Sequence, residues 1–128
     1  MFWPEEGSVG DLMRKVFWTL GRHRYASYDE FVRAVSEYQA QISPDDNGWV
    51  PDAVLAPGPI TVRYTAMWKD VDDTLEVPLG EVGRSLSMGR ALFELNNATV
   101  EFFADADHCF FEGLVPMSTG GYRLRTGS

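Results

Sequence analysis

Residues 87–115 read SMGRALFELNNATVEFFADADHCFFEGLV, and the rest of the chain can be arranged around this stretch. Apolar residues recur at helical spacing over residues 88–102, directly after Ser87, a residue type that favours a helix N-cap. Acidic residues then interrupt the pattern, and residues 109–115 form an aromatic-rich run typical of a strand. We therefore expect a helix, an acidic turn and a core strand in this order.

The first 48 residues predict two helices. Ser8 and Asp11 make a variant capping box, and Gly21 follows the end of the apolar stripe behind it. That stripe consists of Val9, Leu12, Met13, Val16, Phe17 and Leu20. Ser27 and Glu30 make a second capping box before a stripe that ends at residues 43–48, which are rich in turn formers. Since the connection is short, the two helices should pair as an antiparallel hairpin.

The middle and the end of the chain predict strands. Residues 60–68 alternate between apolar and polar side chains, and residues 75–79 provide a partner strand. Pro78 cannot donate a hydrogen bond to a sheet, so this partner strand should lie at the sheet edge. Residues 122–125 predict a last strand. We expect a single α+β domain over residues 1–128 in the order ααββαββ. This is an N-terminal helical hairpin followed by an antiparallel sheet of about four strands with a third helix.

Composition limits the classes of function. The chain of 128 residues is 45% hydrophobic and carries a net charge of −8. This charge disfavours nucleic acid, whose binding depends on cationic side chains at phosphates, and it disfavours an anionic membrane surface. It favours a basic protein partner, although it also serves solubility alone. With no apolar run of about 20 residues, no signal-peptide pattern and only one cysteine, the expected location is cytoplasmic.

One cluster concentrates the residue types that carry chemistry. It consists of Asp105, Asp107, His108, Cys109 and Glu112. A histidine beside carboxylates is the usual basis of acid–base catalysis or of a metal site. Strand alternation places His108 and Glu112 on one face and Cys109 on the other, which is poor geometry for a Cys–His pair. The structural interpretation is that Glu112 pairs with Arg123 or Arg125 across the terminal hairpin.

Asn96 and Asn97 interrupt the predicted helix, because asparagine is a poor helix former. Asn96 lies at the edge of the apolar face. It is interpreted as a buried amide that bridges helix and sheet. The alternative is a polar pocket at the helix–strand junction, lined by Asn96, His108 and Glu112. Together with Asp107, that pocket would be the site of a small enzyme or of a binder of a metal or small molecule.

Standard catalytic signatures are absent from the sequence. It contains no phosphate-binding glycine loop followed by lysine, no dinucleotide fingerprint and no His-Glu-x-x-His. Residues 70–73 resemble the start of a calcium loop, but the later glycine and glutamate of that loop are missing. We therefore expect no catalytic residue, metal or cofactor, and a protein that is more readily a binding module than an enzyme.

Residues 107–114 (DHCFFEGL) followed by residues 122–128 (YRLRTGS) resemble a tail seen in small bacterial proteins. The small, acidic, single-domain build resembles the immunity proteins of bacterial polymorphic-toxin and contact-dependent inhibition systems. The resemblance implies a partner-binding role, in which the chain neutralises a basic toxin by covering its active site, and it carries over no catalytic residues. The expected contact residues are Asp70, Asp72, Asp73, Asp105, Asp107, Trp49 and Trp68.

A homodimer is the remaining alternative for the partner. It would form through the outer face of the sheet. The side chains in contact would be Thr61, Arg63, Thr65 and Met67.

Overall fold

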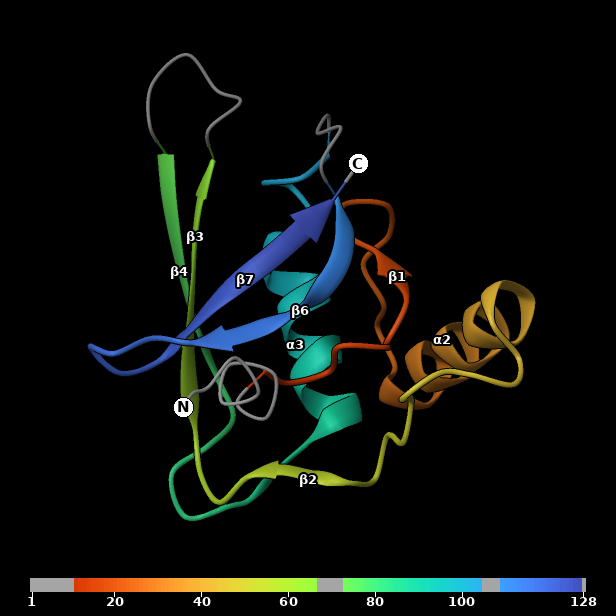
Figure 1. The fold of residues 1–128 in the computed structure, drawn as a ribbon, viewed down its shortest axis with the longest axis horizontal. Coiled ribbons are helices and arrows are strands. Elements are labelled where there is room, and N and C mark those ends of the chain that lie inside the picture. The colour runs from red at the N-terminus through yellow and green to blue at the C-terminus, as the bar shows by residue number, and fades with distance from the viewer. Residues whose placement is uncertain (1–10, 67–72, 105–108, 128) are drawn as a thin grey trace, which may run out of the picture.

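The computed structural model describes residues 11–66, 73–104 and 109–127. Its centre is a five-stranded sheet with the strand order β1-β6-β7-β3-β4 (Figure 1). These strands are β1 (Trp18–Thr19), β3 (Ile60–Ala66), β4 (Asp73–Leu79), β6 (Phe110–Pro116) and β7 (Tyr122–Gly127). A two-stranded sheet pairs β2 (Val54–Ala56) with β5 (Leu86–Ser87), and the helices are α2 (Tyr28–Ile42) and α3 (Met88–Thr99).

The expected arrangement ααββαββ is wrong. Within the described residues there are two helices and seven strands. The main sheet is mixed rather than antiparallel, because β3 runs parallel to β7, with Val62 opposite Tyr122 and Arg63 opposite Arg123. The terminal hairpin β6–β7 is therefore inserted between β1 and the β3–β4 hairpin. Chain order alone does not reveal this placement, because it is decided by contacts between distant residues.

The first expected helix is also wrong over the part of it that the structure describes, residues 11–20. Met13 has a φ of 58°, which a right-handed helix does not allow. Leu12 forms an isolated bridge to Leu114, and Trp18 pairs with Phe111 of β6. The segment is an irregular edge strand, and its hydrogen bonds to β6 replace those that a helix would have made. Residues 8–10 lie outside the described residues.

Ser27 and Ser87 are both confirmed as N-caps. Ser27 is the N-cap of α2, where its hydroxyl accepts a hydrogen bond from the Glu30 N–H at 3.3 Å. Ser87 caps α3 in the same way, accepting from the Arg90 N–H at 3.2 Å. The edge position of β4, which was predicted from Pro78, is confirmed by the strand order. These features are predicted correctly because each depends on a few residues that are neighbours in the chain.

Helix α3 covers one face of the main sheet, and α2 packs beside the sheet at its β1 edge. Figure 1 shows α3 behind the sheet and α2 to one side, beyond β1. The core between them consists of fully buried side chains that include Leu92 and Leu95 of α3 and Leu114 of β6. Gln39 ties α2 to the edge segment, since its side-chain amide accepts from the Phe17 N–H at 2.8 Å and also donates to the Phe17 carbonyl. In Figure 1 the other face of the sheet is turned toward the viewer, and none of the described helices covers it.

Candidate binding surface on the open face of the sheet

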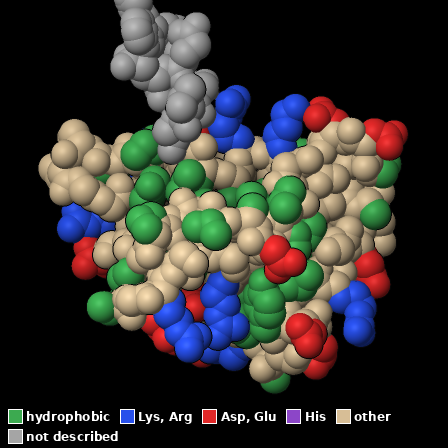
Figure 2. Space-filling view, turned by 90° about the horizontal axis from the view of Figure 1, so that it is seen from below, with side chains coloured by type: hydrophobic (Ala, Val, Ile, Leu, Met, Phe, Trp, Pro, Cys, Tyr) green, Lys and Arg blue, Asp and Glu red, His purple; other side chains and the backbone are tan. Residues whose placement is uncertain are grey.

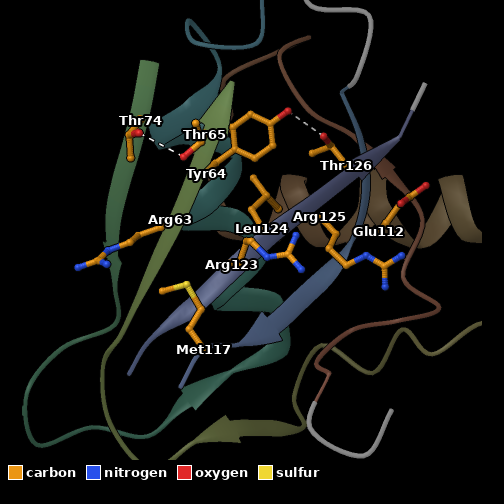
Figure 3. A pocket seen from close by; sticks show the side chains of 10 residues that line it. All are labelled: Arg63, Tyr64, Thr65, Thr74, Glu112, Met117, Arg123, Leu124, Arg125 and Thr126. Atoms are coloured by element: carbon orange, nitrogen blue, oxygen red, sulfur yellow. Dashed lines mark hydrogen bonds between the residues drawn. The ribbon is translucent and has the colours of Figure 1, made fainter. Parts of the chain in front are cut away.

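A broad hollow of about 880 Å³ lies on the uncovered face of the sheet (Figure 3). We call it the arginine hollow. It is lined by Arg63, Tyr64, Thr65, Thr74, Glu112, Met117, Arg123, Leu124, Arg125 and Thr126. Strand alternation creates it: Arg123 and Arg125 are exposed on β7, whereas Leu124 between them is buried in the core. The parallel pairing of β3 with β7 brings Arg63 level with Arg123.

The arginine hollow is basic, although the chain as a whole is acidic. Arg63 forms an ion pair with Glu76 across β3 and β4 at 2.5 Å, and in Figure 3 its side chain points toward β4. Arg125 lies 3.8 Å from a carboxylate oxygen of Asp11. Arg123 makes no ion pair with any side chain that the structure describes. Counting only described neighbours, its charge is therefore the least neutralised in this hollow.

Hydroxyl groups complete the polar lining of the arginine hollow. The hydroxyls of Tyr64 and Thr126 are hydrogen-bonded at 3.0 Å, and those of Thr65 and Thr74 at 3.2 Å (Figure 3). Each pair links neighbouring strands, so these side chains are held in place by the sheet. The floor of the hollow is thus positioned before any ligand arrives, which reduces the ordering cost of binding.

A second hollow of about 600 Å³ adjoins the first at the β1 side of the sheet. We call it the aromatic hollow. It is lined by Arg14, Phe17, Trp18, Tyr38, Ile42, Phe110, Phe111, Glu112 and Arg125. Ile42 is 56% exposed and Phe110 is 43% exposed, which is unusual for large hydrophobic side chains. It exists because β1 is only two residues long, so α2 and β6 are not bridged by a full strand.

Glu112 belongs to both hollows. It lies at a bulge in β6, where the register with β7 shifts between Phe111 and Gly113. Its carboxylate lies against Gly127, in the space that a Cβ at that position would enter. The expected ion pair with Arg123 or Arg125 is not found: Glu112 has no ion pair or hydrogen bond with a described side chain. Arg125 approaches Asp11 instead.

Asn96 and Asn97 clamp α3 to the segment that follows β1. The side-chain oxygen of Asn96 accepts from Trp18 Nε1 at 3.0 Å, and its nitrogen donates to the His23 carbonyl at 2.9 Å. Asn97 accepts from the backbone N–H of Tyr25 at 3.0 Å and donates to its carbonyl at 2.8 Å. The structure thus shows the bridging amide that was expected from the sequence. Of the alternative pocket, Asn96 is 1% exposed in the core whereas Glu112 lines the open face, and His108 lies outside the described residues.

Replacing Asn96 by alanine is expected to lower the free energy of unfolding by about 2 kcal/mol, because it leaves the buried Trp18 indole N–H without a partner and removes the bond to the partly buried His23 carbonyl. Urea unfolding followed by circular dichroism measures this loss. Asn47→Ala is the matched control, since Asn47 makes local bonds at a half-buried turn. An Asn96→Ala loss no greater than that of the control would contradict the clamp.

Tyr25, held at its backbone by Asn97, has a raised pKa because burial disfavours the phenolate and Glu30 adds a repulsive negative charge. The folded state therefore keeps the proton more tightly than the unfolded state. The contribution of Tyr25 to the free energy of unfolding should be fully present below about pH 10, the usual tyrosine pKa. It should be lost as the pH rises through the raised pKa of the folded state. Tyr25→Phe should reduce this alkaline loss. Urea unfolding at pH 7 and at successive values above pH 10 measures it, and an unchanged alkaline loss in Tyr25→Phe would contradict the prediction.

The residues expected to bind a partner fall into two groups. Trp49 is half-buried, and its indole nitrogen donates to the Ser36 hydroxyl at 2.9 Å. Asp73 begins β4 opposite Ala66. The remaining residues, Asp70, Asp72, Asp105, Asp107 and Trp68, lie outside the described residues, as does Met67 of the expected dimer face.

A different apolar surface lies at the end of the molecule formed by β2 and β5. Val50 is 55% exposed, Val54 65% and Val82 91%. Figure 2 looks at this end of the molecule and shows hydrophobic side chains gathered across it, with charged side chains around them. None of the three valines lines the arginine hollow or the aromatic hollow, so they provide controls for variants there.

Comparison with protein-family models, with curated proteins and with solved structures found no match to this chain. Among the residues described, no three His, Cys, Asp or Glu side chains form a group that could hold a metal ion. Cys109 is buried, with 3% of its surface exposed. None of the described helices is long and apolar enough to span a membrane.

From the sequence, Arg123 and Arg125 are identified only as partners for Glu112. Their alternation with Tyr122 and Leu124 is a local signal that places both on one face of a strand. Arg63 joins these two arginines on the same face of the sheet only because β3 pairs in parallel with β7. No local pattern predicts that pairing.

Proposed function

We propose that this chain is a small protein-binding module and that the arginine hollow and the aromatic hollow form its binding face. The supporting observation is that a five-stranded sheet is covered by a helix on one face, while the other face carries a basic hollow of about 880 Å³. The outer face of such a sheet is normally polar. Here it is also concave, and Arg123 has no ion pair among the described residues. Such a face suits recognition of another macromolecule.

Within this class, we propose the role of an immunity protein that covers the active site of a basic toxin. The net charge of −8 supports this role, because a strongly acidic protein attracts a basic partner over long distances and speeds association. Fast association driven by opposite charges suits a protein that must bind a toxin before the toxin acts.

The test is co-expression of the chain with each protein encoded beside it. We expect one neighbour to arrest growth when expressed alone, and growth to return when the chain is present. The purified pair should co-elute in size-exclusion chromatography. If no neighbour is toxic and none binds, the immunity role is wrong.

The charge of the partner is tested separately by stopped-flow association. The association rate constant should fall several-fold between about 50 and 300 mM salt, because salt screens long-range attraction. A rate constant that stays the same or rises with salt would contradict a basic partner while leaving the binding role intact.

A further inference from the structure

The arginine hollow and the aromatic hollow form one continuous surface, because Arg125 and Glu112 line both of them. We call this continuous surface the docking face. The arginine hollow carries the threonine hydroxyls with Arg63, Arg123 and Arg125. The aromatic hollow carries the exposed edges of aromatic and aliphatic side chains, with Arg14 and Arg125 beside them. A single extended segment of a partner protein can therefore contact both hollows.

The charge of the docking face is opposite in sign to that of the whole chain. Its lining includes four arginines and one glutamate. The flanking carboxylates of Glu76 and Asp11 neutralise Arg63 and, more weakly, Arg125. Arg14 and Arg123 form no ion pair with a described side chain. Net charge governs steering over long distances, whereas the local arginines decide which side chains are accepted in contact.

The aromatic hollow provides the place for an apolar anchor. Ile42 and Phe110 form its exposed rim, and Phe17 and Tyr38 also line it. Burying a large apolar side chain against them removes exposed hydrophobic surface from both partners. Interface energy concentrates in such anchors when polar contacts surround them.

We propose that the partner presents to the docking face an acidic segment that carries one large apolar or aromatic side chain. The carboxylates contact Arg123 and Arg125, and the apolar side chain enters the aromatic hollow beside Phe110. The inference rests on the proposed binding function and specifies the chemistry of the segment that is bound. The acidic charge of this segment is opposite to that of the whole partner protein, which the net charge of this chain predicts to be basic.

The probe is a library of random dodecapeptides displayed on phage and selected on the immobilised full chain. We expect the selected peptides to be enriched in Asp and Glu and to contain Trp, Phe or Leu. The strongest peptide, made with a fluorescent label, should bind about tenfold more weakly to the Arg123→Gln/Arg125→Gln variant, which corresponds to ~1.4 kcal/mol. Fluorescence anisotropy measures the dissociation constants.

Matched variants separate the docking face from general effects of charge and hydrophobicity. Arg33→Gln removes an exposed arginine of α2 that lines neither hollow, and it should leave peptide affinity unchanged. Phe110→Ser and Ile42→Ser should each weaken binding, whereas Val54→Ser at the other apolar surface should not. Thermal unfolding of each variant identifies any that fails to fold. If either Phe110→Ser or Ile42→Ser fails to fold, the other is compared with Val54→Ser.

Selected peptides that are neutral or basic, or that bind the arginine double variant as tightly as the unchanged chain, would overturn the inference, as would an empty selection. Two other occupants give distinct results. A dimer in light scattering that dissociates in the arginine variant would assign the docking face to a second copy. Residues 2–6 (FWPEE) carry the proposed chemistry in this chain, so peptide binding that tightens in Glu5→Gln/Glu6→Gln would assign it to that segment. Either result overturns the inference.

The failure of the inference and the failure of the proposed function are distinguishable. If the neighbouring toxin binds the chain with an affinity that Arg123→Gln/Arg125→Gln does not change, the binding role stands and the acidic segment is wrong. If no partner binds while the peptides behave as expected, the docking face is real and the immunity role is wrong.

Discussion

Replacing Phe31 by alanine is expected to lower the free energy of unfolding by about 3–5 kcal/mol, because the residue is fully buried and its removal leaves a cavity. The ring of Phe31 lies edge-on to the rings of Trp18 and Tyr25, with centroids 5.3 Å away in each case. It also contacts Phe93 of α3 at 5.5 Å. One side chain thus joins α2, the segment after β1 and α3.

Urea unfolding measures the effect of Phe31→Ala through the midpoint and the slope of the transition. Val32→Ala is the control on the same helix, because Val32 is half-buried and should cost only about 1 kcal/mol. If Phe31→Ala costs no more than Val32→Ala, α2 is not docked through this ring cluster. Because α2 also supplies Tyr38 and Ile42 to the aromatic hollow, Phe31→Ala should additionally weaken peptide binding there.

Replacing Gly21 by alanine is expected to cost about 3 kcal/mol, from the left-handed backbone and from overpacking together. The φ of Gly21 is +81°, a conformation that side chains disfavour. A Cβ at this position would lie 2.5 Å from the backbone oxygen of Phe103, and a backbone atom cannot rotate out of the way. The close approach is part of how the segment after β1 packs on the turn that follows α3.

Gly83→Ala separates the two contributions to the Gly21 effect. Gly83 has a φ of +85° but nothing within 4 Å of the added Cβ, so only the backbone cost of about 1–2 kcal/mol applies. Urea unfolding of both variants gives the difference. Equal losses would show that Phe103 moves away freely.

The candidate site was only partly predictable from the sequence. The sequence points to Glu112 for an ion pair with Arg123 or Arg125, but the described residues contain no such pair, and Glu112 instead lines both hollows. Asn96 was recognised as unusual, and its buried bridging bonds explain why a poor helix former is placed there. The aromatic hollow could not be foreseen, because its walls come from α2, β1 and β6.

Local signals in the sequence determined the elements whose hydrogen bonds are made within a few residues. Ser27 and Ser87 begin their helices because each hydroxyl bonds an N–H three residues later. Pro78 places β4 at an edge because proline has no N–H to donate. The alternation at residues 122–125 puts both arginines on one face of β7. Each of these features depends only on residues that are close together in the chain, so the sequence predicts it directly.

Tertiary structure alone decided the first segment and the order of the strands. Residues 11–20 carry an apolar stripe that suits a helix, yet backbone bonds from Leu12 to Leu114 of β6 and from Leu20 to Cys109, just before β6, hold them along the sheet edge. The parallel pairing of β3 with β7 unites Arg63 with Arg123 on one face. Backbone hydrogen bonds between distant segments have no local signature, and burial of the whole core selects among the pairings that local preferences allow.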